Sequence, residues 1–330
     1  GALLVAMGAS TYTRQVGFDK LISIGNMSDV NFAEIIDWLG EDEHTGCISL
    51  YVEGFSDGRS FIEAGKKAKK PIIALKSGTS AHGAAAAVSH TGSMAGAAKV
   101  YSAAFQQAGI INASDLNNLF DRTLALSLQP PMKGDNLMVV TNGGGVGVLA
   151  SDAADRYGIP LHFAPEEVQT ELKNYMPEYG SAKNPADLTG MGGEEEHYQS
   201  VRCAYSHEWV DGLIVLICEV PMFEPMDIAR GIQRAIADSE ITDKPVVVSI
   251  IGGKKAQEAM DWLLKQGIPT YFAPDTAVNA MAALRDYARL RLIRADEMAP
   301  LESNGEAVAR QVIKRARADG RDSLTECEAK

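Results

Sequence analysis

The sequence predicts an α/β protein with two tandem, doubly wound domains, each built on a parallel sheet with helices on both faces. Short apolar runs of strand length alternate along the chain with longer segments of helical spacing. The runs are apolar throughout rather than alternating, which is typical of parallel strands buried on both faces. The order of these segments also repeats once within the 330 residues. The same arrangement is therefore expected twice.

The expected elements follow one another in βαβ order. Strands are expected at 21–24, 47–52, 71–75, 137–141, 161–164, 213–218 and 245–250. Helices are expected at 32–39, 59–69, 150–157, 227–237 and 256–265. Because a helix follows most of the strands, the connections are crossovers and the sheets are parallel.

One unit of the chain occurs twice. The stretch 48–78 contains a strand ending at Glu53, a helix, Lys-Pro, a second strand and a glycine. The stretch 213–252 has the same order, with its first strand ending at Glu219. The repeat indicates a duplicated domain.

The second copy is preceded by a strand, a glycine turn and a helix start at 137–150. Its counterpart in the first copy begins only at Gly1-Ala2-Leu3-Leu4, which has the pattern of the helix alone. We therefore expect that the first domain lacks its opening strand in this chain. The natural protein is expected to contain a segment before Gly1.

The boundary between the domains is expected between Gln129 and Asp135, where two prolines and a glycine interrupt both periodicities. The expected first domain covers 1–130 and the second covers 131–300. Residues 301–330 are charged, with a helical pattern at 306–317, and are expected to form a linker.

Composition limits the classes of function. The chain has 31 Lys and Arg against 43 Asp and Glu, a net charge of −12, which argues against a nucleic-acid partner. No apolar run approaches the ~20 residues that cross a bilayer, so no membrane partner is expected. The four cysteines show neither CxxC pairing nor the density of a disulfide scaffold. A reducing cytoplasm is the expected location.

His90 lies in an unusual setting. Residues 76–96 are nearly all Gly, Ala, Ser and Thr, and such small residues let a ligand or another backbone approach closely. A turn of this composition before a helix expected near Ser93 would offer unpaired N–H groups to an anion. The bulky neighbours that would pack a core histidine are missing. We therefore favour a functional role for His90.

Glu53 follows a strand that is expected to be buried. A carboxylate at the carboxyl edge of a parallel sheet points into the ligand crevice. Such a group can bond one imidazole nitrogen, so that the other nitrogen can act as a nucleophile. A helix cap or a surface carboxylate is the alternative, and these residues leave both open.

The turn Asn142-Gly143-Gly144-Gly145 joins a strand to a helix, so its amides and the helix dipole form a seat for phosphate or carboxylate. A dinucleotide site competes, because 145–150 satisfies G-x-G-x-x-G/A. That fingerprint also requires an acidic residue at the end of the next strand, and 161–164 ends in alanine. The patterns of a nucleophile elbow, a P-loop and a metal site are not met, so no metal is predicted.

Jointly these motifs resemble the NDP-forming acyl-CoA synthetase superfamily, which includes succinyl-CoA synthetase and the ADP-forming acetate–CoA ligases. The matching stretches are 1–3, 24–29, 51–54, 57–59, 89–92, 95–96, 141–145 and 184–188. The resemblance implies that each half is one flavodoxin-like ligase domain of the succinyl-CoA synthetase type. The first half would then carry the phosphohistidine loop.

The resemblance also implies roles for single residues. His90 would become phosphorylated, Glu53 would orient it, and phosphate would lie between the N-termini of two helices, one per domain. The implied phosphate-binding residues are Gly1, Ser89, Thr91, Gly92, Asn142, Gly143, Gly144 and Gly145. The implied reaction interconverts acyl-CoA, phosphate and ADP with carboxylic acid, CoA and ATP through an acyl phosphate and phospho-His90.

The family also has a CoA-binding Rossmann domain and an ATP-grasp domain or subunit, and neither fits in this chain. Residues 320–330 resemble the opening of the ATP-grasp part of single-chain members. The resemblance implies no covalently bound cofactor. It implies that CoA, phosphate, and ADP or ATP with Mg are substrates, and that they bind largely to the domains that are absent from this chain. The remaining ligand would be a small acid or acyl-CoA. Docking faces left exposed predict an oligomer, and the chain alone is expected to be an incomplete catalyst.

Two other functions stay open. Related protein acetyltransferases keep this scaffold as a regulatory module and can lack the reactive histidine, whereas this chain has both His90 and Glu53. An NAD-dependent dehydrogenase is the third hypothesis, based on the glycine pattern at 145–150.

Overall fold

A computed structural model of the chain describes residues 1–14, 17–55, 57–91, 98–295 and 305–329, and at 12–14, 87–91, 293–295 and 306 it describes the backbone alone. The chain forms two compact units, residues 1–294 and 295–330. The larger unit contains two parallel sheets. We refer to residues 1–128 as the first lobe and to residues 129–294 as the second lobe.

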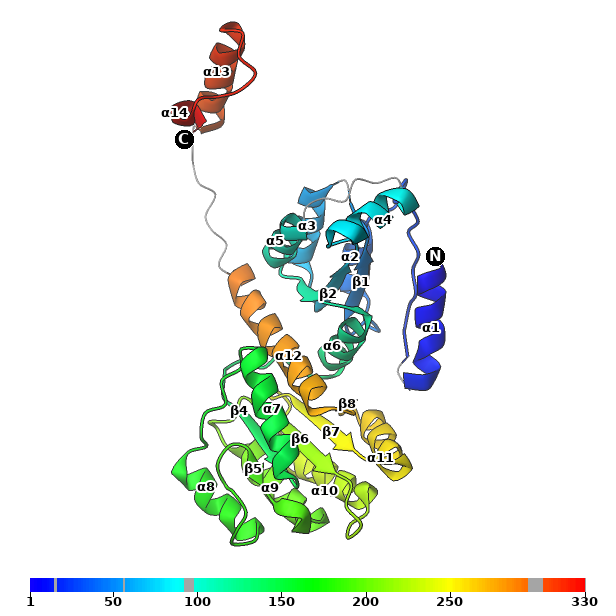
Figure 1. Cartoon of the computed structure of the whole chain (residues 1–330), viewed down its shortest axis with the longest axis vertical. Coiled ribbons are helices and arrows are strands. Elements are labelled where there is room, and N and C mark those ends of the chain that lie inside the picture. Colours follow the sequence, from blue (N-terminus) through cyan, green and yellow to red (C-terminus); the bar gives the residue numbers. More distant parts are fainter. Residues whose placement is uncertain (15–16, 56, 92–97, 296–304, 330) are drawn as a thin grey trace. The chain divides into compact units, whose positions relative to one another are not determined.

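The first lobe has a three-stranded parallel sheet in the order β1-β2-β3 (Figure 1). Its strands are β1 (Ile48–Val52), β2 (Ile72–Lys76) and β3 (Ile111–Ala113). Its helices are α1 (Ala2–Arg14), α2 (Phe32–Glu41), α3 (Gly58–Lys67), α4 (Ala81–Thr91), α5 (Ala98–Ala108) and α6 (Leu116–Leu128). Val52 pairs with Lys76 in register, so β1 and β2 end side by side.

The second lobe has a five-stranded parallel sheet in the order β5-β4-β6-β7-β8. Its strands are β4 (Leu137–Thr141), β5 (Ala186–Asp187), β6 (Gly212–Cys218), β7 (Val246–Ile251) and β8 (Thr270–Tyr271). Its helices are α7 (Gly144–Arg156), α8 (Glu166–Leu172), α9 (Glu194–Ser206), α10 (Pro225–Asp238), α11 (Lys254–Lys265) and α12 (Pro274–Ala295), with short 3₁₀ turns at Lys173–Tyr175 and Thr189–Met191.

The predicted fold class is confirmed, because both sheets are parallel and are flanked by helices. The duplication is visible in the topology, since the order β1-β2-β3 matches β6-β7-β8. In the second lobe β4 and β5 continue the sheet beyond β6. Among the described residues, no strand of the first lobe lies beyond β1 in their place.

Two predicted strands, 21–24 and 161–164, are wrong, because these segments have no regular secondary structure. An apolar run becomes a strand only where it finds a backbone partner and a core face. Leu21 and Ile22 are 45% and 37% exposed, and Phe163 is 68% exposed. These three side chains lie outside the core, and in the second run only Leu161 and Ala164 pack against it, so neither run presents a continuous apolar face. The helices α5, α6 and α12 were not named by the sequence analysis.

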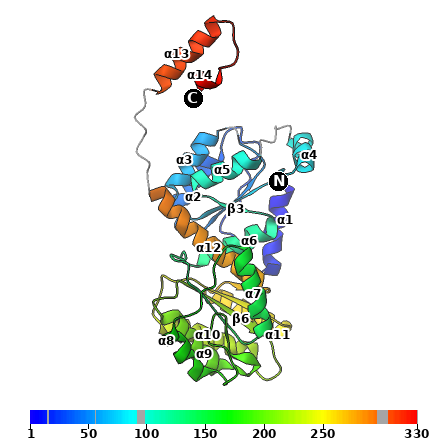
Figure 2. The same ribbon diagram turned by 60° about the vertical axis from the view of Figure 1, so that its left-hand side comes forward.

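One apolar core runs through both lobes. It joins Leu75 of β2 and Leu119 of α6 to Val139 of β4 and Met281 of α12, all of them buried. The helices α6 and α12 cross between the two sheets in both views (Figures 1 and 2). Because they share this core, we expect the two lobes to unfold as one cooperative unit.

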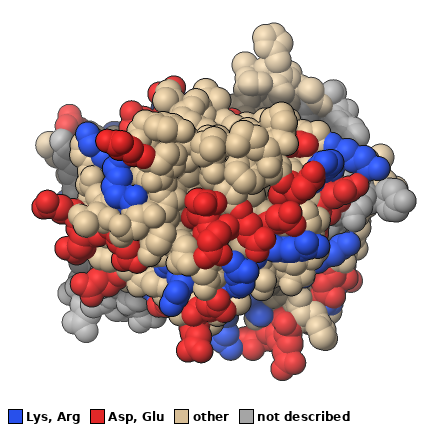
Figure 3. All heavy atoms as spheres, turned by 90° about the horizontal axis from the view of Figure 1, so that it is seen from below, with Lys and Arg blue, Asp and Glu red and all other residues tan. Residues whose placement is uncertain are grey.

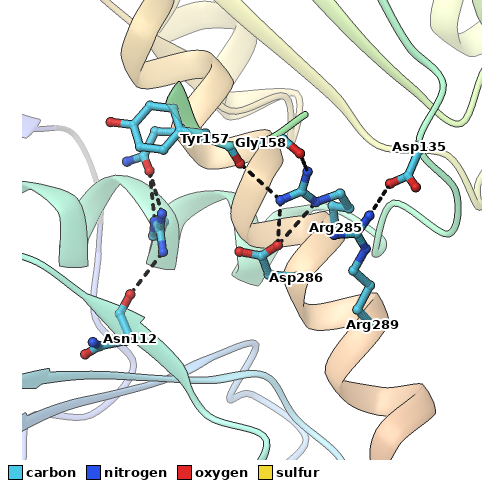
Figure 4. Close-up of polar contacts among 9 residues, drawn as sticks. Asn112, Asp135, Tyr157, Gly158, Arg285, Asp286 and Arg289 are labelled. Atoms are coloured by element: carbon cyan, nitrogen blue, oxygen red, sulfur yellow. Dashed lines mark hydrogen bonds and ion pairs between the residues drawn. The ribbon is translucent and has the colours of Figure 1, made fainter. Parts of the chain in front are cut away.

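Two arginines support this junction, the half-buried Arg122 and the buried Arg285. Arg122 of α6 donates from Nε and Nη2 to Asn279 Oδ1 of α12, at 3.0 and 2.7 Å. Arg285 of α12 donates to the carbonyl oxygens of Tyr157 and Gly158, at the end of α7 (Figure 4). Burial lowers the pKa of Arg122, but a guanidinium stays charged in proteins. The arginines therefore tie α12 to α6 and to the end of α7 by charged hydrogen bonds.

The smaller unit contains α13 (Gly305–Ala318) and α14 (Glu326–Ala329). Arg321 forms a bidentate ion pair with Glu328, at 2.7 and 2.9 Å, and this pair joins the turn after α13 to α14. The pair lowers the pKa of Glu328 to about 2. The helix expected at 306–317 is thus observed within α13.

Within the described ranges, no helix is both long enough and apolar enough to pass through a membrane. The face drawn in Figure 3 carries Lys and Arg side chains interspersed with Asp and Glu. Its coloured part has no continuous basic band, as a surface for the phosphates of a nucleic acid would require.

Candidate functional site

Glu53 leaves β1 at the carboxyl edge of the first sheet. Leu50 and Val52 are buried and fix the strand in the core, so Glu53 emerges at the edge where open α/β sheets bind ligands. Its side chain is half-buried. Among the described residues, the carboxylate has neither an ion pair nor a hydrogen bond. A carboxylate in this state is available to another group at the sheet edge.

Lys76, which the sequence analysis did not single out, lies at the same edge. It is 6% exposed, its Nζ donates to Ser77 O, and its ammonium lies 4.6 Å from the ring centre of Tyr101. Burial lowers the pKa of Lys76, while the charge of Glu53 acts in the opposite direction. The sequence could have indicated this residue, because Lys76 is the last residue of a strand that is otherwise apolar.

An aromatic cluster fixes the loop that follows Glu53. Phe55 stacks on Phe61 with ring centres 4.5 Å apart and meets Tyr101 edge-on at 4.9 Å. Such pairs contribute ~1 kcal/mol each beyond the burial of their area. Because Tyr101 also contacts Lys76, the cluster connects the lysine with the Glu53 loop.

The segment that carries His90 is helical, which corrects the prediction of a small-residue turn there. The predicted site residues in the last turn of α4 are Ser89, His90 and Thr91. Gly92 and the helix start expected near Ser93 lie outside the described residues. The α4 segment follows β2, whose end adjoins that of β1.

The composition of α4 explains its helical state. Alanine has the highest helix propensity of all residues, and residues 84–87 are four alanines in succession. Ser80 Oγ accepts a hydrogen bond from Gly83 N–H at 3.1 Å and so satisfies one amide at the helix start. The small residues that indicated close approach of a ligand therefore also form a helix.

Asn142 closes β4 in the second lobe and is buried. Its Nδ2 donates to Cys218 O at 3.0 Å, and its Oδ1 accepts from Cys218 N–H at 2.7 Å. These two bonds hold the end of β4 against the end of β6. The role of the Asn142 side chain in this structure is to position the turn.

Gly143 is the N-cap of α7, and no side chain caps the helix. The first amides of a helix have no intrahelical partner, and the Gly143 N–H is bonded to Thr141 Oγ1 at 3.0 Å. The amides of Gly144 and Gly145 therefore stay available together with the positive end of the helix dipole. This is the geometry of an anion seat.

A side chain at either of the first two glycines would have to displace a neighbouring side chain. A Cβ on Gly143 would lie 2.9 Å from Cys218 Sγ, and one on Gly144 would lie 2.8 Å from Asp187 Oδ2. Both distances are shorter than Cβ contacts in proteins. A Cβ on Gly145 would meet no described atom within 4 Å. The space in front of Gly145 is therefore open.

Gly1 precedes the other helix start that the sequence analysis named. It is exposed, and its amino group donates to Ser23 Oγ at 3.0 Å. In both views the beginning of α1 lies close to α4 (Figures 1 and 2). The structure thus brings Gly1 and the α4 segment to the same side of the first lobe.

Glu219 occupies in the second lobe the place that Glu53 has in the first. Its Oε2 accepts from Gly253 N–H at 2.6 Å, where α11 begins. A cavity of about 400 Å³ opens beside it, lined by residues between 219 and 225 and between 252 and 255. In the second lobe, β7 is followed directly by α11, whose start Glu219 caps. In the first lobe, α4 comes between β2 and α5, the helix that corresponds to α11. Glu53 therefore has no corresponding helix start to cap.

The predicted phosphate-binding residues belong to two separate sheet edges. Glu53 and α4 lie at the carboxyl edge of the first sheet, and the turn from Asn142 to Gly145 lies at that of the second. In the part of the chain that the structure describes, no three His, Cys, Asp or Glu side chains are grouped to hold a metal ion.

Two protein-family profiles match the chain. The succinyl-CoA ligase-like flavodoxin domain matches residues 1–126, and the Ligase-CoA domain matches residues 137–296. The first match falls within the first lobe, and the second match covers nearly all of the second lobe.

Curated relatives include the α subunit of ADP-forming acetate–CoA ligase I of Pyrococcus furiosus. It is 42% identical over 291 residues, which are 88% of this chain and 63% of that subunit. ADP-forming acetate–CoA ligase I of Archaeoglobus fulgidus is 36% identical over 292 residues, covering 88% of this chain and 41% of that protein. The chain therefore spans less than two thirds of these relatives.

A solved structure with the same fold is dinucleotide-forming acetyl-coenzyme A synthetase 1 of Ca. Korarchaeum cryptofilum, in complex with phosphate and ADP. It superimposes with a TM-score of 0.87 at 39% identity, over 91% of this chain and 65% of that one. The same protein without ligands gives a TM-score of 0.86. The similarity extends over both lobes.

Proposed function

Because the chain belongs to the NDP-forming acyl-CoA synthetase family, we propose that it is the ligase-domain core of an ADP-forming acyl-CoA synthetase. In the proposed reaction, acyl-CoA and phosphate give an acyl phosphate and CoA. His90 then takes the phosphoryl group and releases the carboxylate, and phospho-His90 passes the group to ADP. The observation that carries this proposal is that Glu53 and the segment bearing His90 follow two strands that end side by side.

The proposed role of Glu53 is to orient His90. A carboxylate that accepts a hydrogen bond from one imidazole nitrogen leaves the lone pair of the other nitrogen free to attack phosphorus. The half-buried Glu53 carboxylate has no partner among the described residues, which supports this role. Its counterpart Glu219 is already bonded to Gly253 and could not act in this way.

The proposed phosphate seat uses the N-termini of α1 and α7. Helix amides and dipoles stabilise the charge that develops on the transferred oxygens. The uncapped start of α7, with its open space at Gly145, supports this assignment. The proposed phosphate-binding residues are Gly1, Ser89, Thr91, Gly92, Asn142, Gly143, Gly144 and Gly145.

The proposal includes domains outside this chain. The ligase domains would cover 1–130 and 131–300, with 301–330 leading to an ATP-grasp domain or subunit. CoA and ADP or ATP with Mg would bind largely to that part and to a CoA-binding Rossmann domain. The greater length of the relatives supports this division. An oligomeric assembly, a small acid or acyl-CoA as ligand, and a reducing cytoplasm complete the proposal.

The test is phosphorylation of the full-length protein by acetyl phosphate, followed by intact-mass analysis. One phosphoryl group should be gained, and it should be labile in acid and stable in base, as expected of phosphohistidine. His90→Ala should abolish the gain. His82→Ala is the matched control, because His82 lies on the same helix and is exposed. A folded protein that takes up no phosphoryl group would contradict the proposal and favour the regulatory-module hypothesis.

A further inference from the structure

A carboxylate lies beside the start of α7, where phosphate is proposed to bind. Asp187 is the last residue of β5 and pairs in register with Thr141, the last residue of β4. Leu188 N–H donates to Thr141 O at 2.7 Å, so the two strands end side by side. A Cβ on Gly144, the first residue of α7, would lie 2.8 Å from Asp187 Oδ2. The carboxylate therefore lies against the first residue of the helix.

The charge of Asp187 also acts on the other side of the glycine turn. There a Cβ on Gly143 would lie 2.9 Å from Cys218 Sγ, at the end of β6. Burial raises the pKa of the Cys218 thiol, and the charge of Asp187 raises this pKa further. A negative charge is thus built in beside a helix start whose free amides attract anions.

One oxygen of the Asp187 carboxylate is fixed and the other is free. Thr189 N–H donates to Oδ1 at 2.8 Å. Thr189 has a φ of 62°, which is rare for a β-branched residue, and such a conformation persists only where the surrounding structure holds it. Among the described residues, no group donates a hydrogen bond to Oδ2. This oxygen of the half-buried side chain is available to a ligand.

A free carboxylate oxygen selects the anion that binds next to it. An ionised carboxylate accepts hydrogen bonds but donates none, and it repels an anion that brings no proton. Monohydrogen phosphate keeps one P–O–H group at neutral pH and can donate it to the carboxylate, while its other oxygens accept from the helix amides. Sulfate has a similar size and the same charge but has no proton to donate. The two anions therefore differ at this one contact.

We propose that Asp187 is a specificity-determining residue, which accepts a hydrogen bond from the P–O–H group of phosphate at the start of α7 and thereby excludes sulfate. The inference rests on the proposed function, because it requires phosphate at this helix start. The open space in front of Gly145 gives the anion room beside the carboxylate. A site that bonds a hydroxyl of its ligand rejects the analogue without it, because the acceptor is then left without a donor.

The test is calorimetric titration of the full-length protein with inorganic phosphate and with sulfate, at neutral pH and constant ionic strength. The wild type should bind phosphate at least about 30-fold more tightly than sulfate, and Asp187→Asn should lower this ratio about tenfold or more. An amide N–H can donate to sulfate, and the amide oxygen still accepts from Thr189 N–H, so the turn is preserved. Gly145→Glu fills the open space and should abolish the binding, which assigns it to the start of α7.

Asp152→Asn is the matched control. Asp152 is exposed on the same helix, about two turns after its start, and its substitution removes the same charge. The ratio should then change less than about twofold, because solvent screens an exposed charge at this distance. If Asp187 acted only on the helix dipole, Asp187→Asn would strengthen the binding of both anions equally and leave the ratio unchanged.

The inference would be overturned by an unchanged ratio in Asp187→Asn, by equal affinities of the wild type for the two anions, or by binding that persists in Gly145→Glu. A wild type that binds phosphate selectively but is not phosphorylated at His90 would instead contradict the proposed phosphoryl transfer, and the role of Asp187 would stand. The two failures are therefore distinguishable.

Discussion

Glu53 and Glu219 occupy one place in two copies of the same fold, yet their surroundings assign them different roles. Glu219 is bonded to the first amide of α11, at 2.6 Å from Gly253. Glu53 forms no hydrogen bond or ion pair among the described residues, and its charge acts on the buried Lys76. Glu219, which has a structural role, can therefore be used as the control for Glu53, for which a catalytic role is proposed.

Substitution of Glu53 by Gln should slow phosphorylation of His90 about 100-fold, because an amide cannot stabilise the charge on the imidazole as a carboxylate does. The measurement is the rate of phosphoryl uptake from acetyl phosphate at saturating concentration. Glu219→Gln is the control and should change this rate less than about threefold, because Gln still accepts the Gly253 bond. Equal losses in the two variants would show that Glu53 acts on stability only.

His197 is a buried histidine that has no role in the proposed reaction. It lies in α9 with no exposed surface, and its Nδ1 donates to Gly193 O at 2.8 Å. Its Nε2 has no partner among the described atoms. Burial lowers the pKa of His197 to about 4. The residue is therefore neutral in the folded protein at neutral pH.

This depressed pKa predicts a loss of stability in weak acid. An unfolded histidine titrates near 6.5, so between pH 6.5 and about 4 the unfolded chain binds a proton that the folded chain does not. The contribution of His197 is complete above pH 6.5 and declines by about 3 kcal/mol as the pH falls to 4. Urea unfolding at a series of pH values measures it. His197→Phe should show a shallower pH dependence, and identical slopes would rule out this residue as the cause.

At the scale of elements, strand composition was sufficient to predict β1, β2, β4, β6 and β7, but not the strands of two or three residues, β3, β5 and β8. The runs that became β2, β4, β6 and β7 are buried on both faces, and β1 is buried on one face and half-buried on the other. Such runs are recognisable without knowledge of their partners. The glycine turn at α7 was also predictable, because its residues are fixed by local geometry. The runs at 21–24 and 161–164 were not, since only tertiary structure decides whether a short apolar run finds a pairing partner.

For the candidate site, the sequence singles out residues but not their arrangement. Glu53 and His90 were selected because each stands out against its local sequence, and their roles stay predictions. Lys76 was missed, because its burial against Tyr101 depends on α5, which is distant in the sequence. The helical state of α4 was missed because the small residues of that segment are compatible with both a turn and a helix. The orientation of the two lobes depends on α12, and no local pattern encodes it.

At the scale of the whole molecule, α12 determines how the lobes are joined, and two of its arginines offer a direct comparison (Figure 4). Arg285 is 5% exposed and donates to Tyr157 O at 3.2 Å, to Gly158 O and to Asp286. Arg289, one turn later, has a half-exposed side chain and pairs with Asp135 at 2.7 Å. Both residues are arginines of the same helix, and they differ in how deeply they are buried.

We expect Arg285→Ala to lower the free energy of unfolding by about 3 kcal/mol, because it removes the hydrogen bonds of a buried guanidinium to two carbonyl oxygens and to Asp286 and opens a void. Arg289→Ala should cost less than about 1 kcal/mol, as is usual for an exposed ion pair. Because the core is shared, Trp38 in the first lobe and Trp209 and Trp262 in the second should report one common shift of the urea midpoint in Arg285→Ala. Single-tryptophan versions of the chain measure this directly. A shift confined to the second lobe would mean that the lobes unfold independently, and that α12 joins them without coupling their stability.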